Sequence, residues 1–383
     1  MKSQPLCYII ASGMGSAHGT EMHTALMAAE LRKNGYRTVL YTAHFNANRS
    51  EWTSYLKKNE VCVRHPGFWF MTRRHWPLRM IAWRMLRDAR RERPQLIWAP
   101  ENNETICYAV ARNKEEFPFF VHDNCEAGPV HPYYPSLWFK VCNQITGLTV
   151  HGQRQKKSAI FYYKMTKPVS VVWPSSFPPK QVAPLNPIGK KIRFGQFGRL
   201  YSMKGSVFAV AAFAQCVATG ADAELHFFGD GPFKAPTEEL ARSLGLREKV
   251  FFHGGYHWDQ LDELVAQIDV GLMPSIYEGF GLVMLELMSR GRPVIATDVG
   301  SSREVLENLG GGWVVPRANT AELAKALTLC ANASEIVRQK GAEARAVWQQ
   351  HFTPEQMYRR YAEFWRECGV PANEGQRIKP LSA

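Results

Sequence analysis

Two glutamates, Glu278 and Glu286, frame a glycine-containing loop in the C-terminal half of the sequence. The loop consists of Gly279, Phe280 and Gly281, and the apolar runs on either side predict a strand before it and a helix after it. Free N–H groups at a helix N-terminus attract phosphate, and glycines let a phosphate approach the backbone. A carboxylate accepts two hydrogen bonds and so matches a vicinal diol of a sugar or a ribose. An acid, a phosphate site and a second acid together predict a nucleotide-sugar site.

An ordinary structural role is equally compatible with the spacing of Glu286. Arg290 follows four residues later in the predicted helix. An i,i+4 pair on a helix surface would contribute only ~0.2–0.5 kcal/mol to helix stability. Both interpretations stay open on spacing alone.

Two cations follow the first predicted strand of the C-terminal half. Arg199 and Lys204 lie beside Gly198 and Gly205 in the segment FGRLYSMKG. A planar guanidinium and a compact ammonium suit a diphosphate whose negative charge grows as its bond to a sugar breaks. Two solvated loop cations are the alternative. The sequence contains no D-x-D motif and no histidine or cysteine cluster at ligand spacing, so no metal is predicted.

Polar residues also close two predicted strands of the N-terminal half. Glu101 and Asn102 follow the run QLIWAP, and His122 and Asp123 end the run FPFFVH. Ligands of parallel sheets bind at the carboxyl ends of strands, so Glu101, Asn102 and Asp123 are candidate contacts to an acceptor. A lone histidine at a strand end is most often a surface or capping residue, and this remains the alternative for His122.

The elements that position these residues are apolar runs alternating with helical patterns, which predict an α/β protein with two doubly wound, Rossmann-like domains facing a cleft. The first domain is predicted at residues 1–180 and the second at 190–352, with the proline-rich segment SSFPPKQVAPLNPIGKK as the linker. Strands are predicted at residues 6–12, 37–43, 61–65, 95–100, 117–122, 147–152, 169–173, 191–198, 223–232, 250–255 and 269–275.

The stretch EGFGLVMLE resembles the E-x7-E signature of the retaining glycosyltransferases of family 4 and their GT-B relatives. The resemblance continues through GRPVIATDVGSSREVLE and GGWVVP, extends over residues 192–350, and is loose in the N-terminal half. It implies the GT-B fold, in which a C-terminal helix, here within residues 354–383, packs back on the N-terminal domain.

The same resemblance implies how a transfer would be carried out. Arg199 and Lys204 match residues that contact the donor diphosphate, and His122 matches a histidine that contacts the donor sugar. With Glu278, these residues form the predicted catalytic group. The implied reaction is retaining transfer through an oxocarbenium-like state, in which the leaving phosphate helps to deprotonate the acceptor hydroxyl.

Glycine-containing loops complete the predicted donor site. Gly15 and Gly19 lie in the first loop, which is a weak dinucleotide fingerprint because His18 stands where the third glycine of G-x-G-x-x-G is expected. In the family this loop approaches the donor phosphate, so both glycines are predicted donor contacts. Gly231, in the segment GDGP, is predicted to border the nucleobase through its backbone.

The excess positive charge is confined to the first half of the chain. Residues 1–185 contain 25 Lys and Arg against 12 Asp and Glu, whereas residues 186–383 contain 22 of each kind. Such asymmetry predicts an anionic partner: a phospholipid surface, a lipid-linked diphosphate or a nucleic acid. Residues 76–91 mix tryptophan and arginine around an apolar stripe at helical spacing. This segment is predicted to be a crossover helix, and contact with an anionic membrane through it and the aromatic residues 69–76 is left open.

These features predict a cytoplasmic hexosyltransferase that moves a hexose from a UDP- or GDP-sugar to a glycan or lipid-linked acceptor, in bacterial surface polysaccharide synthesis and without a cofactor. The scattered cysteines and the shortness of the first apolar run support the cytoplasm. Another sugar-nucleotide enzyme of GT-B type, such as an epimerase, is one alternative, and the E-x7-E loop argues against it. The other alternative is a basic nucleic-acid-binding protein. This interpretation gives no function to Glu278 and Glu286 beside an anion-binding loop.

Overall fold

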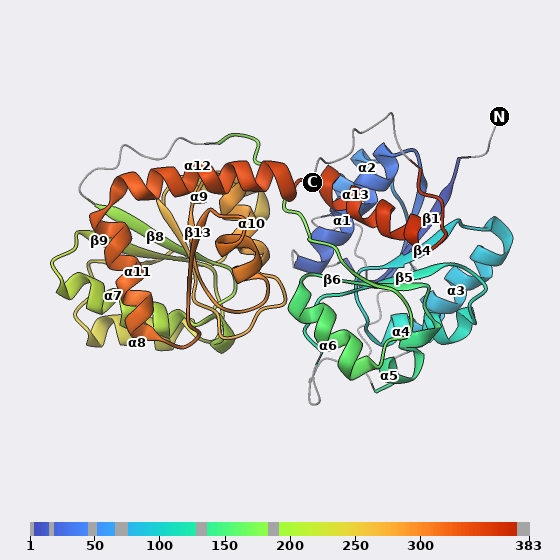
Figure 1. Ribbon diagram of the computed structural model, residues 1–383, viewed down its shortest axis with the longest axis horizontal. Coiled ribbons are helices and arrows are strands. Elements are labelled where there is room, and N and C mark those ends of the chain that lie inside the picture. Colours follow the sequence, from blue (N-terminus) through green and yellow to red (C-terminus); the bar gives the residue numbers. More distant parts are fainter. Residues whose placement is uncertain are drawn as a thin grey trace. The chain divides into compact units, whose positions relative to one another are not determined.

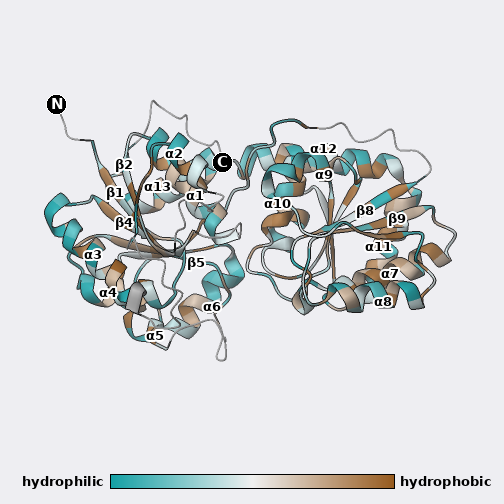
Figure 2. Cartoon of the chain, turned by 180° about the vertical axis from the view of Figure 1, so that it is seen from behind, coloured by the Kyte–Doolittle hydropathy of each residue, from teal (hydrophilic) through white to brown (hydrophobic). Residues whose placement is uncertain are grey.

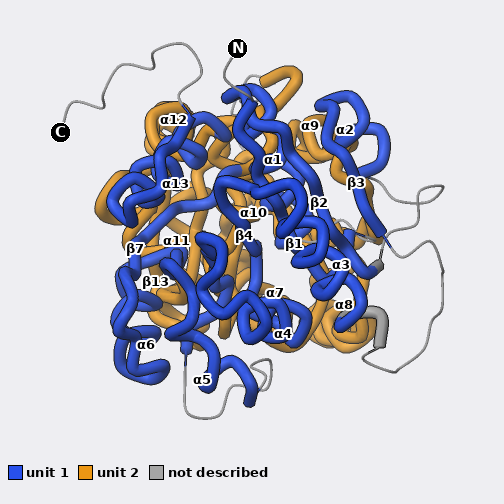
Figure 3. The backbone as a smooth tube through the Cα atoms, turned by 90° about the vertical axis from the view of Figure 1, so that its right-hand side faces the viewer, with its two compact units in different colours: residues 1–175, 354–383 blue, residues 176–353 orange. Residues whose placement is uncertain are grey.

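The computed structural model describes residues 4–14, 19–44, 52–65, 76–127, 136–182 and 191–373. The chain divides into two compact units, unit 1 (residues 1–175 and 354–383) and unit 2 (residues 176–353), which Figure 3 shows in different colours. The chain therefore leaves unit 1 once and returns to it for its last helix. The division after Ser175 lies at the start of the proline-rich segment.

Unit 1 is a seven-stranded parallel sheet flanked by helices (Figure 1). The order of its strands is β3-β2-β1-β4-β5-β6-β7. The strands are β1 (Leu6–Gly13), β2 (Arg37–His44), β3 (Cys62–Arg64), β4 (Leu96–Ala99), β5 (Phe119–Asp123), β6 (Gly147–Val150) and β7 (Val169–Val171). The helices are α1 (Gly19–Lys33), α2 (Thr53–Lys58), α3 (Trp76–Glu92), α4 (Glu104–Asn113), α5 (Trp138–Val141), the short 3₁₀ turn η1 (Cys142–Gln144), α6 (Gln153–Tyr163) and α13 (Pro354–Glu367).

The core of unit 1 follows from the sequence pattern. The stripe predicted within residues 76–91 is buried on α3, where Ile81, Met85 and Ala89 are at most 1% exposed. These residues pack with apolar side chains of the sheet in one hydrophobic cluster. The prediction of a crossover helix is confirmed, because an amphipathic helix buries its apolar stripe against a sheet.

The last helix completes the other face of unit 1. α13 packs beside α1, and its Phe364 lies against the sheet at Gly147, where a Cβ atom would approach the phenyl ring to 2.7 Å. The aromatic rings of Phe120 and Trp365 lie 6.0 Å apart. The C-terminal segment therefore forms part of the core of unit 1.

Unit 2 is a six-stranded parallel sheet in the order β10-β9-β8-β11-β12-β13. Figure 2 shows hydrophobic colours along β8 and β9 and mixed colours along the helices. The strands are β8 (Ile192–Phe197), β9 (Ala223–Phe228), β10 (Val250–Phe252), β11 (Val270–Met273), β12 (Val294–Thr297) and β13 (Gly312–Val315). The helical segments are η2 (Ser202–Lys204), α7 (Ser206–Ala218), α8 (Lys234–Ser243), η3 (Trp258–Gln260), α9 (Leu261–Val265), α10 (Leu282–Ser289), the π-helical η4 (Arg303–Glu307), α11 (Thr320–Asn332) and α12 (Ser334–His351).

The strand orders confirm the prediction of two doubly wound α/β sheets, and each sheet has one point where the winding direction reverses. In unit 1 this switch point lies between β1 and β4, and in unit 2 it lies between β8 and β11. At a switch point the loops that follow the two strands diverge, and the crevice outside their carboxyl ends is where open α/β sheets bind ligands. Among the described residues, no helix combines the length and the apolar character needed to cross a bilayer.

Candidate functional site

The switch point of unit 2 brings two loops into direct contact. Residues 198–205 follow β8 and residues 274–281 follow β11, and these two strands are paired neighbours. Gly205 has a φ of +70°, and a Cβ atom at this position would lie 1.9 Å from the carbonyl oxygen of Pro274. Only glycine fits such a position, so the backbone alone fixes how closely the loops approach.

An ion pair joins the same two loops. The Nζ of Lys204 donates to Oε1 of Glu278 at 2.6 Å, and the hydroxyl of Ser275 donates to the same oxygen at 2.8 Å. The side chains of Lys204 and Glu278 are 26% and 12% exposed. An ammonium carries more than one donor, so Lys204 can bind an anion without leaving Glu278. The alternative of a freely solvated cation is therefore wrong for Lys204.

Arg199 lies on the loop after β8 and is exposed. Its guanidinium carbon lies 5.1 Å from the centroid of the Tyr201 ring, a cation–π distance. Stacking on an aromatic ring limits the freedom of the long side chain while leaving the planar fork able to bind oxygen atoms.

The loop after β11 ends at the start of α10. Gly281 precedes the helix with a φ of +92°, and among the described residues no side chain caps its N-terminus. Phe280 is 3% exposed and anchors the loop in the core. Gly300, which follows β12, packs closely against this loop. A Cβ atom at Gly300 would lie 2.8 Å from the carbonyl oxygen of Gly279. The helix therefore presents uncapped N–H groups beside the Lys204–Glu278 pair, as a phosphate site requires.

Glu286 is half-buried in α10, and burial raises the pKa of its carboxyl above the ordinary value of 4.5, against the opposing effects of Arg290 and Lys204. Arg290 is engaged elsewhere: its Nε donates to Oδ1 of Asp262 at 2.8 Å, and its Nη1 donates to the backbone carbonyl of Glu286 at 3.0 Å. The interpretation of Glu286 and Arg290 as an i,i+4 surface ion pair is therefore wrong, because the Arg290 guanidinium pairs with the Asp262 carboxylate instead. Among the described residues, the Glu286 carboxylate makes no hydrogen bond or ion pair. A carboxylate with a perturbed pKa and no protein partner is typical of a functional site.

The loop after β9 packs closely on the loop after β8. Cβ atoms at Gly229 and Gly231 would lie 1.9 Å from the Gly198 carbonyl oxygen and 2.5 Å from the Leu200 carbonyl oxygen, and both glycines have a φ of +152°. The N–H of Gly229 also donates to the carbonyl of Gly254 at 2.7 Å. The predicted nucleobase loop is thus part of the same strand-end surface as Arg199.

The switch point of unit 1 also carries an acid. The N–H and the hydroxyl of Ser12 both donate to Oε1 of Glu101, at 2.9 and 2.6 Å, and burial raises the pKa of this carboxyl in spite of these bonds. Asn102 is 9% exposed, and its Nδ2 has no hydrogen-bond partner among the described residues. Buried polar atoms are nearly always paired, so an unused donor here fits the predicted contact with an acceptor.

His122 and Asp123 end β5 as predicted, but neither side chain is open at the strand end. Both are 0% exposed. Oδ2 of Asp123 accepts a hydrogen bond of 2.8 Å from Tyr163, while the ring of His122 is covered by Tyr361 of α13. Neither side chain presents an exposed atom within unit 1, so their placement gives no support to a sugar contact by His122 or an acceptor contact by Asp123. The sequence could not show this burial, because the covering helix lies at the other end of the chain.

The described residues contain one group that the sequence did not reveal. His23, His122 and His151 are buried together, and one ring nitrogen of each lies within 4.8 Å of the others. The absence of a histidine cluster at ligand spacing therefore held for the linear sequence and not for the folded chain. Gly19 begins α1, whereas Gly15 and the aromatic residues 69–75 lie outside the described residues.

Comparison with known proteins finds a family match over most of unit 2. Residues 179–347 match the family model for glycosyl transferases group 1, a segment that contains the complete switch-point site of this unit. N-acetyl-alpha-D-glucosaminyl L-malate synthase of Bacillus anthracis is 34% identical over 152 residues, which cover 40% of this chain and 39% of the relative. Alpha-D-kanosaminyltransferase of Streptomyces kanamyceticus is 32% identical over 149 residues, covering 39% and 38%. The chain thus spans about two fifths of the length of these relatives.

A solved structure matches over nearly the whole chain. Anabaena Alr3699/HepE, in complex with UDP, has a TM-score of 0.75 at 19% sequence identity, with 95% of this chain and 100% of the other covered. At this identity the likeness shows the fold alone. It confirms the predicted GT-B type of fold, with two α/β units that each contain a parallel sheet.

Proposed function

We propose that the protein is a retaining hexosyltransferase, because residues 179–347 match the family model for glycosyl transferases group 1. It would move a hexose from a nucleotide-diphosphate sugar to a hydroxyl of a glycan or lipid-linked acceptor. The observation that carries this proposal is the Lys204–Glu278 pair beside the uncapped start of α10, at the switch point of unit 2.

The donor diphosphate would lie between the loop after β8 and the start of α10. Lys204 and Arg199 supply positive charge from the loop, and the helix supplies free N–H groups. Glu286 offers an unpaired carboxylate to a vicinal diol, either on the ribose or on the sugar. Glu278 orients Lys204 and faces the transferred sugar from the other side of the phosphate site.

In the transfer, the bond between the sugar C1 and the phosphate oxygen breaks, and a bond from C1 to the acceptor oxygen forms. The acceptor proton passes to the departing phosphate, so the reaction balances without an enzymatic base. Charge that grows on the diphosphate is stabilised by Lys204, Arg199 and the helix N-terminus, which are in place before the reaction. This assignment needs no metal at the donor site. An epimerase would use the same donor site without an acceptor.

The donor is proposed to be a UDP-sugar. Structures of Anabaena Alr3699/HepE contain UDP, UDP with glucose, and UDP-glucose, which supports testing uridine nucleotides first. A structural relative of lower score, WaaG, is involved in lipopolysaccharide biosynthesis, which supports a role in surface polysaccharide synthesis.

Unit 1 is proposed to bind the acceptor and to meet the inner face of the membrane, with the protein in the cytoplasm. Glu101 and Asn102 at its switch point are the candidate acceptor contacts. On the outer surface of unit 1, Met80 and Trp83 of α3 are 47% and 54% exposed among arginines, and Phe161 of α6 is 74% exposed. Exposed aromatic residues beside cations are typical of surfaces that rest on anionic lipid.

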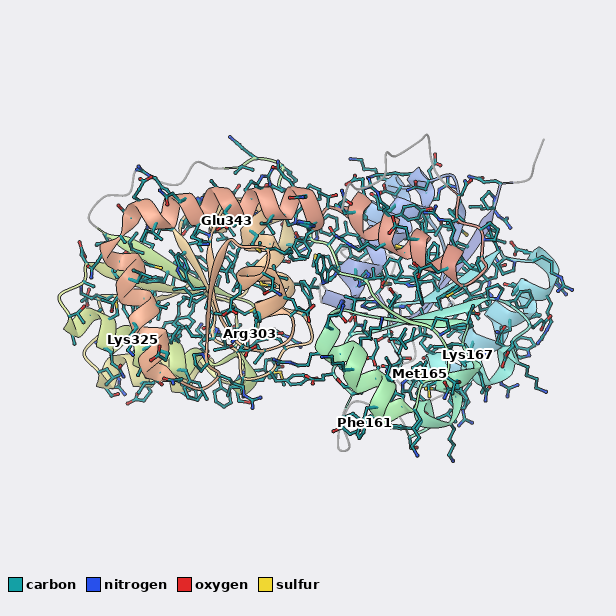
Figure 4. All side chains as sticks on the ribbon, in the orientation of Figure 1. Phe161, Met165, Lys167, Arg303, Lys325 and Glu343 are labelled. Carbon is teal, nitrogen blue, oxygen red and sulfur yellow. The ribbon has the colours of Figure 1, made fainter. Side chains whose placement is uncertain are left out.

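The test is a thermal-shift series with UDP, GDP, ADP, CDP and their common sugar conjugates. A ligand at 100 times its Kd stabilises the folded protein by roughly 2.7 kcal/mol, so one nucleotide family should raise the unfolding midpoint above the others. Lys204→Ala should abolish that shift. The matched control is Lys325→Ala on α11, labelled in Figure 4, because Lys325 also pairs with a glutamate at 2.6 Å but on an open helix surface.

A positive nucleotide is then followed to product. Release of the nucleoside diphosphate that requires an added acceptor, with the anomeric configuration of the sugar kept in the product by NMR, supports retaining transfer. Conversion of the donor without an acceptor would instead indicate the epimerase alternative. A shift that survives Lys204→Ala would contradict the proposed site.

A further inference from the structure

Three histidines from three different elements meet in the interior of unit 1. His23 lies on α1, His122 on β5, and His151 directly after β6. They are 1%, 0% and 4% exposed. The Nε2 of His122 lies 3.0 Å from Nδ1 and 3.3 Å from Nε2 of His151, and one nitrogen of each of the three rings lies within 4.8 Å of the others.

The surroundings of this histidine cluster are aromatic and neutral. The hydroxyl of Tyr361 on α13 lies 3.1 Å from Nε2 of His23 and 2.7 Å from Nδ1 of His122, and the ring of Trp98 packs against His23. Thr149 and Asn124 supply further polar contacts, at 2.8 Å to His122 and 3.2 Å to His151, and the backbone of Val172 also bonds the ring of His151.

A chain of hydrogen bonds can satisfy these groups in one arrangement of protons. His23 donates to the Tyr361 oxygen, Tyr361 donates to Nδ1 of His122, His122 donates to Nδ1 of His151, and His151 donates to Asn124. In this arrangement every imidazole is neutral, which is the form that binds metal ions. Three neutral imidazoles from three elements are thus gathered around one buried point, and metal binding requires only that the proton between His122 and His151 moves to Nδ1 of His122.

We propose that the histidine cluster is a binding site for a divalent transition-metal ion, with His23, His122 (through the Nε2 that faces His151) and His151 as ligands and a water molecule in the fourth position. Imidazole ligands without a carboxylate suit Zn²⁺ and its neighbours and do not suit Mg²⁺ or Ca²⁺. When Nε2 of His122 binds the metal, its proton moves to Nδ1, which then donates to the Tyr361 oxygen, so Tyr361 stays protonated beside the site. The metal would tie α1 to the centre of the sheet.

The geometry requires one small adjustment. A tetrahedral zinc site with bonds of about 2.0–2.1 Å places its ligand nitrogens roughly 3.3 Å apart. His122 and His151 already have nitrogens 3.0 and 3.3 Å apart. Closing the largest separation in the cluster from 4.8 Å to this distance needs a movement of roughly 1.5 Å, within reach of a side-chain rotation. The inference concerns unit 1 alone and does not rest on the proposed transfer.

Metal content of the full chain tests the site. Protein produced with added Zn²⁺ and dialysed against metal-free buffer should retain one zinc per chain by elemental analysis, and Co²⁺ in its place should give the intense visible absorption of a four-coordinate ion. Stripping the metal with a chelator should lower the unfolding midpoint, and returning Zn²⁺ alone should restore it.

Variants separate this site from adventitious binding. His151→Gln and, independently, His23→Gln should lose the bound zinc, whereas Tyr361→Phe should keep it, because Tyr361 lies at the other nitrogen of His122. His226→Gln is the control and should keep the bound zinc, because His226 and His253 of unit 2 also lie 3.0 Å apart, with Glu224 at 3.4 Å from His226 but, among the described residues, without a third histidine. Circular dichroism confirms that each variant is folded. Zinc well below one equivalent in the unmodified protein, or a full equivalent in a folded His151→Gln variant, would overturn the proposal and leave the hydrogen-bond chain as the function of the cluster.

Discussion

Lys204 on the loop after β8 and Glu278 on the loop after β11 form an ion pair with 2.6 Å between Nζ and Oε1. A diphosphate that reaches Lys204 must bring its negative charge close to the Glu278 carboxylate. Two unit charges 4 Å apart interact by about 1 kcal/mol in water and about 4 kcal/mol at an effective dielectric constant of 20. A free nucleoside diphosphate carries more negative charge than its sugar conjugate, so at the proposed site Glu278 would oppose binding of the product more than binding of the donor.

Removing the negative charge of Glu278 should therefore slow the release of the nucleoside diphosphate product. Glu278→Gln is expected to tighten UDP binding by roughly 3- to 10-fold, equivalent to about 0.7–1.4 kcal/mol of relieved repulsion, and to slow the transfer of sugar. Isothermal titration calorimetry measures the first effect, and release of nucleoside diphosphate measures the second.

Glu322→Gln is the matched control for this change, because Glu322 accepts from Lys325 at 2.6 Å on the surface of α11. It should leave UDP binding unchanged. Weaker UDP binding by Glu278→Gln would contradict the electrostatic account. It would mean that the hydrogen bond by which Glu278 positions Lys204 contributes more to UDP binding than the negative charge of Glu278 takes away.

Glu286 links donor binding to pH. Burial raises the pKa of its carboxyl above 4.5, so between the unfolded and the folded pKa the folded protein holds a proton that the unfolded chain has released. The free energy of unfolding therefore falls as pH rises through this interval. Glu286→Gln should raise the free energy of unfolding by about 0.5–2 kcal/mol at pH 7 and weaken donor binding, because the amide is a poorer acceptor for a diol.

Urea unfolding at pH 7 and at pH 4 checks the sign, since the gain from Glu286→Gln should shrink at the lower pH. Glu335→Gln, which removes a carboxylate that is 69% exposed, should change neither stability nor donor affinity appreciably. A loss of stability at pH 7 in Glu286→Gln would show that the charged carboxylate is favourable in the free protein.

The sequence was sufficient for the sheets and for the places of the loops at the switch point of unit 2, because each strand is a short apolar run and each of these loops is marked by glycine. It failed where a distant segment decides the outcome. Arg290 stands at the right spacing for Glu286, but Asp262 lies nearer to its guanidinium in the fold. His122 ends a strand as predicted, but Tyr361, from the other end of the chain, covers it.

The histidine cluster could not be predicted for the same reason. His23, His122 and His151 belong to separate elements, and no local spacing connects them. Their meeting depends on the order of β5 and β6 in the sheet and on where α1 packs, which are properties of the whole of unit 1.

Gly205 tests whether the contact between the two donor loops matters for function. Gly205→Ala combines a left-handed backbone with a clash, because its Cβ would lie 1.9 Å from the Pro274 carbonyl oxygen. The loop must move, which displaces Lys204. The expected result is destabilisation by more than ~3 kcal/mol and loss of the nucleotide-dependent thermal shift.

Gly245 provides a closely matched control in the same unit. Its φ is also +70°, and among the described residues no atom lies within 4 Å of the place that a Cβ would occupy. Gly245→Ala should therefore cost only the backbone strain, about 1–2 kcal/mol, and should keep the nucleotide shift. Equal destabilisation by the two substitutions in urea unfolding would show that the loop contact at Pro274 is unimportant.

Membrane contact through α3 predicts a specific dependence on Trp83. The protein should float with phosphatidylglycerol vesicles at low salt and be released at high salt, because surface attraction between cations and anionic lipid is screened by ions. Trp83→Ala should reduce the bound fraction several-fold by removing an aromatic side chain that is 54% exposed.

Two further substitutions decide which surface is responsible for this binding. Leu244→Ala removes a similarly exposed apolar side chain from unit 2, at 45%, and should leave flotation unchanged. Phe161→Ala acts on α6, where Figure 4 labels the residue at the surface of unit 1. A loss of binding in Phe161→Ala but not in Trp83→Ala would transfer the contact from α3 to α6. No flotation of the unmodified protein at low salt would remove the membrane from the proposed function while leaving the donor site of unit 2 unaffected.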